Sequence, residues 1–294
     1  MSSYPEALRD TVERYIADLR FPSAAPQTAG LEEAMRYSLL AGGKRIRPVL
    51  TLATARAIGR DSADVLPLAA AIELIHTYSL IHDDLPAMDD DELRRGRPTC
   101  HVKYGEDVAI LAGDGLYAEA FRLVLNEQPA DPRNLLKAVG ELAAATGVNG
   151  MVGGQYIDVQ ALVPQGAATL RRLHELKTGR LIGASVECVL LLMEGSDEGS
   201  RLPQFPHFAA ELGVLFQIVD DILDVTGTDD ALGKPRGSDE RHGKVTYVTQ
   251  YGLDGAREMA AESHRNARAA LAQAAPGGAA ELEQITDFIA TRTS

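Results

Sequence analysis

Residues 72–97 read IELIHTYSLIHDDLPAMDDDELRRGR, an apolar segment that leads into clustered carboxylates and then into arginines. Apolar residues three and four apart indicate a helix that delivers the carboxylates at its C-terminal end. That end of a helix carries partial negative charge, so clustered carboxylates there are unfavourable without a bound cation. Oxygen ligands without Cys or paired His favour a hard ion such as Mg²⁺ or Ca²⁺. We therefore expect a metal site here rather than a solvated acidic turn.

The composition excludes several classes of protein. The 294 residues are 45% hydrophobic and carry a net charge of −13, which argues against nucleic acid as a partner. Cys100 and Cys188 are too few for a disulfide framework or a zinc site. Residues 1–20 contain acidic side chains, unlike a secretory signal, and the longest apolar run, near 189–193, is too short to cross a bilayer. We expect a cytoplasmic protein without a membrane span.

The spacing of apolar residues predicts an all-α protein with a single domain over residues 1–294, because strand and hairpin signals are nearly absent. A polar loop at 227–243 is a candidate lid over a site. The expected helices cover residues 4–20, 31–41, a stretch from Pro48, 64–84, 101–125, 132–146, 148–163, 167–194 and 207–225, with three shorter helices over 245–291.

A second acidic cluster stands in FQIVDDILDVTG, residues 216–227, again after an apolar helical segment. Asp220 and Asp224 are four residues apart and share a helix face. Two such clusters suggest the facing walls of one site. Mg²⁺ keeps several waters and is usually completed by substrate phosphates, so we expect a substrate that carries a diphosphate.

Cationic residues occur in several short motifs that suit such a substrate. GGKRIRP at 42–48 precedes a helix start, where anions bind favourably. A single Lys or Arg is usually a solvated charge, and we expect this of Arg45 and Arg97. His76 lies two turns before Asp83 on the same helix face, and both a structural role and a ligand role remain open for it.

Together these motifs resemble those of the trans-isoprenyl diphosphate synthases, or polyprenyl synthetases, and most of all the bacterial farnesyl diphosphate synthases. The resemblance covers nearly the whole chain, and the order of the pieces makes it specific. The matching segments are GGKRIRP at 42–48, DDLPAMD at 83–89, RRG at 94–96, GGQ at 153–155, KTG at 177–179, FQIVDDILD at 216–224 and GKPRGSD at 233–239.

The resemblance implies a fold of about ten or more helices around a central cavity. It implies Mg²⁺-dependent, head-to-tail condensation of isopentenyl diphosphate with dimethylallyl or geranyl diphosphate, to give (2E,6E)-farnesyl diphosphate. It also implies three Mg²⁺ per site, with Mn²⁺ able to substitute, and a homodimer. No nucleophilic side chain is needed. Our hypothesis is that the departing diphosphate accepts the proton.

The resemblance also assigns roles to individual residues. Asp83, Asp89 and Asp220 would ligate the metal ions, with Asp84, Asp221 and Asp224 near them. Isopentenyl diphosphate would be held by Lys44, Arg47, His76 and Arg95. The allylic diphosphate would be held by Arg94, Lys177, Thr178, Gln217 and Lys234, of which Lys177 and Lys234 are also counted with the aspartates as catalytic.

In this family the residue five before the first aspartate helps to form the floor of the pocket for the prenyl tail, so the resemblance implies that product length depends on Tyr78 and on Ser79 beside it. A bulky aromatic there should stop growth at fifteen carbons.

A geranylgeranyl diphosphate synthase of the same fold is the nearest alternative. A class I terpene cyclase would not need GGKRIRP, a phosphohydrolase of the His-Asp type would need more clustered histidines, and a non-catalytic subunit would be expected to have lost aspartates.

Overall fold

A computed structural model describes residues 4–21, 25–160, 162, 167–193, 204–227 and 244–292 of the chain. Lys234 and nearly all of the expected lid at 227–243 lie outside these residues. Within these residues the protein is all-α apart from one short hairpin, in agreement with the spacing of its apolar residues. The helices are α1 (Glu6–Asp18), α2 (Ala29–Leu39), α3 (Ile46–Ala57), α4 (Leu66–Asp83), α5 (Cys100–Tyr104), α6 (Glu106–Glu127), α7 (Pro132–Thr146), α8 (Met151–Val159), α9 (Ala167–His174), α10 (Arg180–Leu192), α11 (Gln204–Thr226), α14 (Tyr247–Ala274) and α15 (Ala280–Thr291).

Helix α4 is the centre of the bundle, since nearly every side chain from Pro67 to Ile75 is buried whichever face it lies on. A helix that is apolar all round must be enclosed by other helices. Accordingly, α4 packs between α3 and α6. Within the described residues, Ser62–Asp83 is the one segment long and apolar enough to pass a membrane-span test, and 67% of its tested window is buried inside the protein.

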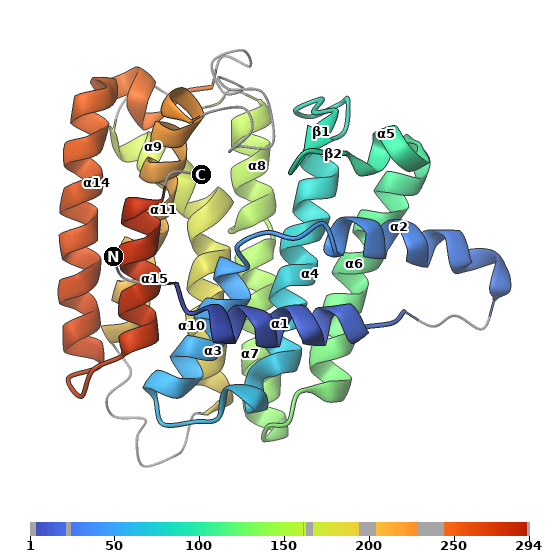
Figure 1. The fold of residues 1–294 in the computed structure, drawn as a ribbon, viewed down its shortest axis with the longest axis horizontal. Helices are drawn as coiled ribbons and strands as arrows, with labels where there is room; N and C mark the ends of the chain where they lie inside the picture. The colour runs from blue at the N-terminus through green and yellow to red at the C-terminus, as the bar shows by residue number, and fades with distance from the viewer. Residues whose placement is uncertain are drawn as a thin grey trace.

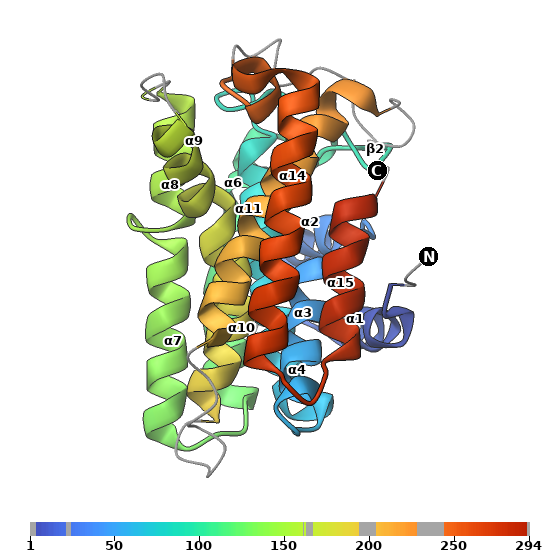
Figure 2. The same ribbon diagram turned by 90° about the vertical axis from the view of Figure 1, so that its left-hand side faces the viewer.

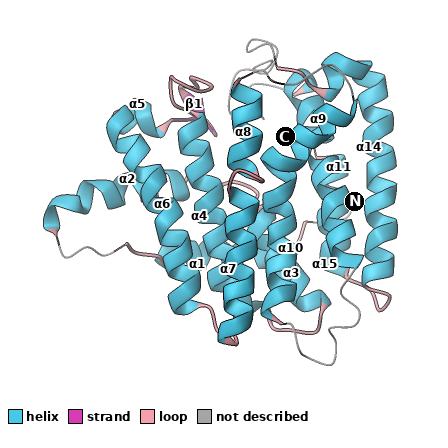
Figure 3. Ribbon diagram, turned by 180° about the vertical axis from the view of Figure 1, so that it is seen from behind, coloured by secondary structure: helices cyan, strands magenta, loops and turns pink. Residues whose placement is uncertain are grey.

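The remaining helices surround α4 in a bundle (Figure 1). Helices α10, α11, α14 and α15 run on one side, with α11 packed along α14. Seen after a quarter turn, α14 and α15 lie in front of α11 and α3. In this view α7 is at the left-hand edge of the bundle and α1 is at the right-hand edge (Figure 2). Helices α1 and α2 lie across the long helices (Figure 1), and the view from behind shows α2 reaching outward beside α6 (Figure 3). The C-terminal ends of α4 and α11 both lie at the end of the bundle where the hairpin is.

Most predicted helices are confirmed, with three local departures. The expected helix at 101–125 is broken at Gly105. Its φ of 92° is allowed for glycine but does not occur in an α-helix. The helix expected at 167–194 contains a wide π turn at Glu175–Gly179 between α9 and α10. The three helices expected over 245–291 are two, because the chain continues through a kink at Gly252 in α14.

The hairpin consists of β1 (Leu93–Arg94) and β2 (Arg97–Pro98) and was not expected from the sequence. Its two-residue turn has positive φ at both positions, 54° at Arg95 and 71° at Gly96. Such turns match the twist of paired strands, and they usually contain Asn or Gly at the first position. Arginine in the left-handed region costs about 1–2 kcal/mol, which is why the Arg-Gly pair gives no ordinary hairpin signal.

Candidate active site

A cavity of about 600 Å³ opens at the end of the bundle where α4 and α11 end. Its wall contains one carboxylate from each acidic cluster and most of the predicted cations. The lining residues named in the sequence prediction are Arg47, His76, Tyr78, Ser79, Asp83, Arg94, Arg95, Lys177, Thr178, Gln217 and Asp220. The apolar part of the wall comes from Leu80, Met88, Met151, Val152, Val159 and Phe216. The structure therefore brings together segments from residue 47 to residue 220 around one space.

The carboxylates of the first cluster point to different surroundings. Asp83 lines the cavity, and burial raises the pKa of its carboxyl to about 6, although Lys177 opposes this. Asp84 does not line the cavity and is held by Arg94, whose Nε lies 2.8 Å from both carboxylate oxygens. Asp89 accepts a hydrogen bond from Lys244 Nζ at 3.0 Å. Asp83 is therefore the cluster's cavity-facing carboxylate, and Asp84 positions Arg94 at the rim.

The hairpin turn places Arg95 against the turn that contains Gly42 and Gly43. The Arg95 guanidinium donates to the carbonyl of Gly42. Gly43 has a φ of 124°, which favours glycine, and a Cβ atom there would lie 2.6 Å from Arg95 Cζ and force the guanidinium to shift. The first acidic cluster and GGKRIRP are thus tied together through the two arginines of the RRG motif, Arg94 at the end of β1 and Arg95 in the hairpin turn.

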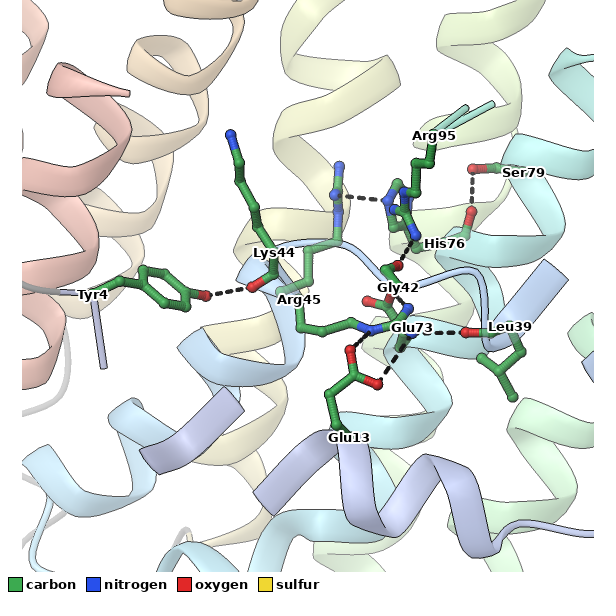
Figure 4. Close-up of polar contacts among 11 residues, drawn as sticks. Tyr4, Glu13, Leu39, Gly42, Lys44, Arg45, Glu73, His76, Ser79 and Arg95 are labelled. Atoms are coloured by element: carbon green, nitrogen blue, oxygen red, sulfur yellow. Dashed lines mark hydrogen bonds and ion pairs between the residues drawn. The ribbon is translucent and has the colours of Figure 1, made fainter. Parts of the chain in front are cut away.

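The prediction that Arg45 is a solvated charge is wrong. Its side chain is fully buried and forms ion pairs with Glu73 at 2.6 Å and Glu13 at 2.8 Å (Figure 4). It also donates to the carbonyl of Leu39 at 2.7 Å. Arg45 therefore joins α1, the end of α2 and α4 beneath the site. Arg97 is exposed, as expected, and lies over the ring of Tyr37.

Four cationic side chains lie close together near this turn: Lys44, Arg47, Arg95 and Arg292. Figure 4 shows Lys44 pointing to the opposite side of the turn from Arg45, and Arg95 reaching from the hairpin onto the carbonyl of Gly42. Burial and the nearby Arg292 lower the pKa of Lys44 to about 8. Burial lowers the pKa of Arg47 to about 10. Buried cations this close together, whose pKa values burial and their neighbours' positive charges lower, favour the binding of an anion with several charges.

His76 lies within this cationic group and lines the cavity. Its Nε2 is 3.5 Å from Arg47 Nη1, and burial together with Arg47 holds the pKa of the imidazole well below its ordinary value. His76 is therefore neutral at neutral pH and can either donate or accept a hydrogen bond. Its position favours a role in the site over a purely structural one.

The π turn brings Lys177 and Thr178 to the opposite wall. A Cβ atom on Gly154 would lie 2.3 Å from the backbone nitrogen of Lys177, and a Cβ atom on Gly213 would lie 3.0 Å from Gly179 Cα. Both glycines let α8 and α11 approach the turn closely. Wide turns of this kind inside helices occur frequently at functional sites.

Polar contacts fix the side chains of the π turn. Lys177 Nζ binds Asp158 at 2.5 Å, and Thr178 donates to Gln217 Oε1 at 3.0 Å. Gln217 in turn donates to Asp221 at 2.7 Å. Asp221 is buried and also accepts the amide hydrogen of Tyr247 at 2.8 Å, so its contacts anchor the start of α14.

The second cluster presents Asp220 to the cavity. Asp220 is paired with Arg292, which follows α15 and was not predicted from the sequence. Asp158 was also absent from the predicted site, and Lys244 and Gln155 had been assigned no role in it. Both polar atoms of the Gln155 side chain are buried at the cavity wall without a hydrogen-bond partner. An unpaired amide at a cavity wall fits a polar ligand there.

The donor set fits hard divalent cations that are completed by a ligand. No three His, Cys, Asp or Glu side chains converge on one point in the described part of the chain. Asp89 instead forms an ion pair with Lys244, and Asp220 forms one with Arg292. Mg²⁺ is usually held by one or two carboxylates with waters and substrate phosphates, so an all-protein cage is not required. The raised pKa of Asp83 shows a carboxylate that a nearby divalent cation would stabilise.

A helical bundle with two acidic helix ends around one cationic cavity is the arrangement of a prenyl diphosphate synthase, and residues 28–287 match the family of polyprenyl synthetases. The chain belongs to this family. It is 44% identical to farnesyl diphosphate synthase of Geobacillus stearothermophilus over 99% of this chain and 96% of that protein. It is also 44% identical to the chloroplastic geranylgeranyl pyrophosphate synthase 9 of Arabidopsis thaliana over 94% of this chain and 77% of that protein.

A solved structure of similar fold is geranyltransferase from Helicobacter pylori, complexed with magnesium and isoprenyl diphosphate. The two chains share 32% identity, with a TM-score of 0.81 over 98% of this chain and 97% of that one. The expected family and all-α fold are confirmed by these findings.

Proposed function

We propose that this protein is a magnesium-dependent prenyltransferase that condenses isopentenyl diphosphate with dimethylallyl and geranyl diphosphates to give (2E,6E)-farnesyl diphosphate. One observation carries the proposal most directly. A single cavity has Asp83 on α4, Asp220 on α11 and a cationic wall around Arg47, with an apolar part that suits a prenyl chain. The high identity to a farnesyl diphosphate synthase along the whole chain supports the same reaction.

The residue assignment remains a proposal and follows the geometry. Asp83, Asp89 and Asp220 would hold Mg²⁺, with three ions per site and Mn²⁺ able to replace them. Bound Mg²⁺ would supply positive charge to the leaving diphosphate. Lys44, Arg47, His76 and Arg95 would hold isopentenyl diphosphate. The allylic diphosphate would contact Arg94, Lys177, Thr178, Gln217 and Lys234, the last of which lies outside the described residues.

The chain's own side chains would act mainly by electrostatics and by exclusion of water. Lys177, already within the cavity wall, provides a fixed positive charge for the departing diphosphate. Cleavage of the allylic carbon–oxygen bond leaves a carbocation that must not meet water, and Met151 and Phe216 provide an apolar wall. The double bond of isopentenyl diphosphate then forms the new carbon–carbon bond, and a proton passes to the departed diphosphate.

The proposal is tested by incubating the protein with labelled isopentenyl diphosphate and geranyl diphosphate, with and without Mg²⁺. The expected result is Mg²⁺-dependent formation of a fifteen-carbon diphosphate. A twenty-carbon main product would favour geranylgeranyl diphosphate synthesis, which the similar chloroplastic relative makes the second candidate. Cyclic hydrocarbons formed without isopentenyl diphosphate would contradict both.

Three further expectations belong to the proposal. The whole chain forms one domain, which a shared core that reaches from Tyr4 to Ile289 supports. The enzyme is a cytoplasmic homodimer. Exposed apolar side chains on neighbouring helices, Leu111 and Leu125 on α6 and Leu136 on α7, support a contact between subunits there. Light scattering during size-exclusion chromatography measures the expected doubling of mass.

A further inference from the structure

Tyr4 lies just before α1 and contacts two segments that are distant from it in the chain. Its hydroxyl donates a hydrogen bond to the backbone carbonyl of Lys44 at 2.7 Å (Figure 4). Its ring centroid lies 4.7 Å from that of Phe288 on α15, with the two rings tilted by 52°. The side chain is buried. Tyr4 therefore joins the GGKRIRP segment to α15.

The carbonyl that Tyr4 binds belongs to a strained turn. Arg45, the next residue, has a φ of 52°, in the left-handed region that is uncommon for residues with a side chain. Such a residue keeps its conformation only where its surroundings fix it. Ion pairs with Glu13 and Glu73 fix the side chain of Arg45, and Tyr4 fixes the peptide group that precedes it. The direction in which the Lys44 side chain leaves the turn is thus set from two sides.

Phe288 contacts the other end of Lys44. The Nζ atom lies 5.4 Å from the centroid of this ring, within the range of a cation–π contact. Because Tyr4 packs against the same ring, it acts on Lys44 twice, at the carbonyl directly and at the ammonium group through Phe288. Burial raises the pKa of Tyr4 above its ordinary value, so its hydroxyl remains a donor at neutral and mildly alkaline pH.

We propose that Tyr4 is a positioning residue for isopentenyl diphosphate and acts through Lys44. The inference rests on the proposed function, in which Lys44 binds this substrate. A lysine side chain loses conformational freedom when it binds an anion, and the loss is smaller when its backbone and its ammonium group are already held. Neither Tyr4 nor Phe288 lines the cavity, so the allylic substrate, which Lys177 would bind at the opposite wall, should not depend on Tyr4.

The test compares the unaltered protein with Tyr4→Phe, which removes the hydroxyl and keeps the ring. Steady-state kinetics at saturating geranyl diphosphate should show KM for isopentenyl diphosphate raised about three- to tenfold, the usual effect of losing one hydrogen bond. The value of kcat and the KM for geranyl diphosphate should stay unchanged. The matched control is Tyr15→Phe, which removes the hydroxyl of a half-buried tyrosine on α1 and should leave both KM values unchanged.

A double-mutant cycle separates positioning through Lys44 from a general effect on the fold. Lys44→Ala should itself weaken the binding of isopentenyl diphosphate. Tyr4→Phe added to it should have little further effect, because the side chain through which Tyr4 acts is gone. Phe288→Leu should raise the same KM, since it removes the ring beside the ammonium group. A Tyr4→Phe effect that keeps its full size in the Lys44→Ala background, or that falls equally on both substrates, would overturn the inference.

Isothermal titration calorimetry with isopentenyl diphosphate in the presence of EDTA gives a second readout without turnover. The dissociation constant of Tyr4→Phe should exceed that of the unaltered protein by about the same factor as KM does. Thermal unfolding should give nearly equal midpoints for the two proteins, because the ring still packs on Phe288. If the unaltered protein forms no prenyl product, the proposed function itself fails, whereas product formation with an unchanged KM in Tyr4→Phe rejects only the role of Tyr4.

Discussion

Arg292 donates a hydrogen bond to Asp220 at 3.1 Å, although 72 residues separate them. The Arg292 guanidinium also stacks on the ring of Phe216 at 4.3 Å, and only 6% of its side chain is exposed. The residue that follows α15 thus provides a cation for the first aspartate of the second acidic cluster. A divalent cation bound at Asp220 would have to share this carboxylate with Arg292 or displace it.

Arg292→Met is therefore expected to strengthen Mg²⁺ binding to the substrate-free enzyme by severalfold, because the competing cation is removed. Isothermal titration calorimetry with Mg²⁺ alone measures this without turnover. The control is Arg265→Met, which removes an exposed cation on α14 and should leave the affinity unchanged. Equal Mg²⁺ affinity in the unaltered protein and Arg292→Met would show that Arg292 does not compete.

Asp83→Ala and Asp220→Ala should each lower kcat/KM. The loss should correspond to about 2–3 kcal/mol or more of transition-state stabilisation, comparable to the loss of one electrostatic contact. Steady-state kinetics at limiting Mg²⁺ measures the change. Asp90→Asn is the control within the first cluster, since Asp90 is exposed and asparagine tolerates its φ of 51°. Near-normal turnover in either alanine variant would refute the metal assignment.

Tyr78→Ala is expected to lengthen the product from fifteen toward twenty carbons, because the ring that lines the cavity on α4 is removed. Reversed-phase chromatography of the dephosphorylated products measures the chain length. Tyr78→Phe keeps the ring and should still make the fifteen-carbon product. If Tyr78→Ala makes only farnesyl diphosphate, this ring is not the floor of the pocket, and Ser79 becomes the remaining candidate.

Arg45→Met should lower the free energy of unfolding by about 3–5 kcal/mol, because it leaves Glu73 buried without its cation. Urea denaturation followed by circular dichroism measures the loss. Arg97→Met is the matched control in an exposed position and should change stability by no more than about 0.5 kcal/mol. A loss in Arg45→Met no larger than in Arg97→Met would contradict the role of the buried ion pair.

The activity should depend on pH through Lys44, whose pKa is lowered to about 8 by burial and by Arg292. Below this pH Lys44 is charged and attracts a diphosphate; as the pH rises through 8 the charge is lost. We therefore expect kcat/KM for isopentenyl diphosphate to fall between about pH 8 and 9. Lys44→Arg keeps its charge over this range, so its profile should be flat there. The same fall in both proteins would assign it to another group.

Sequence patterns predicted the helices and the residues of the cavity better than they predicted how these residues are paired. Apolar spacing identifies a helix such as α7, whose bounds were expected as 132–146 and are found there. Motifs on separate helices, Asp83 and Asp220 among them, do face one cavity. These features depend on local periodicity and on residue type, both of which the sequence shows directly.

Pairings between distant residues are the features that the sequence did not reveal. Nothing next to Arg45 in the chain indicates that α1 and α4 place two glutamates around it. Arg292 gives no signal either, because its partner Asp220 comes from another helix. The hairpin was missed because a left-handed arginine forms its turn, and this strain is tolerated only where tertiary contacts hold the residue.

The close approach at Gly154 and Gly213 has a consequence for mutational tolerance. Neither glycine carries chemistry, yet a single methyl group at Gly154 would push against the backbone of Lys177. In a saturation library scored for activity, Gly154 should be nearly as intolerant as the aspartates, and Gly213 somewhat less so. Selection for new product lengths should therefore leave the junction of α8, α11 and the π turn unchanged, and draw its successful variants from elsewhere in the cavity wall, such as Tyr78 on α4.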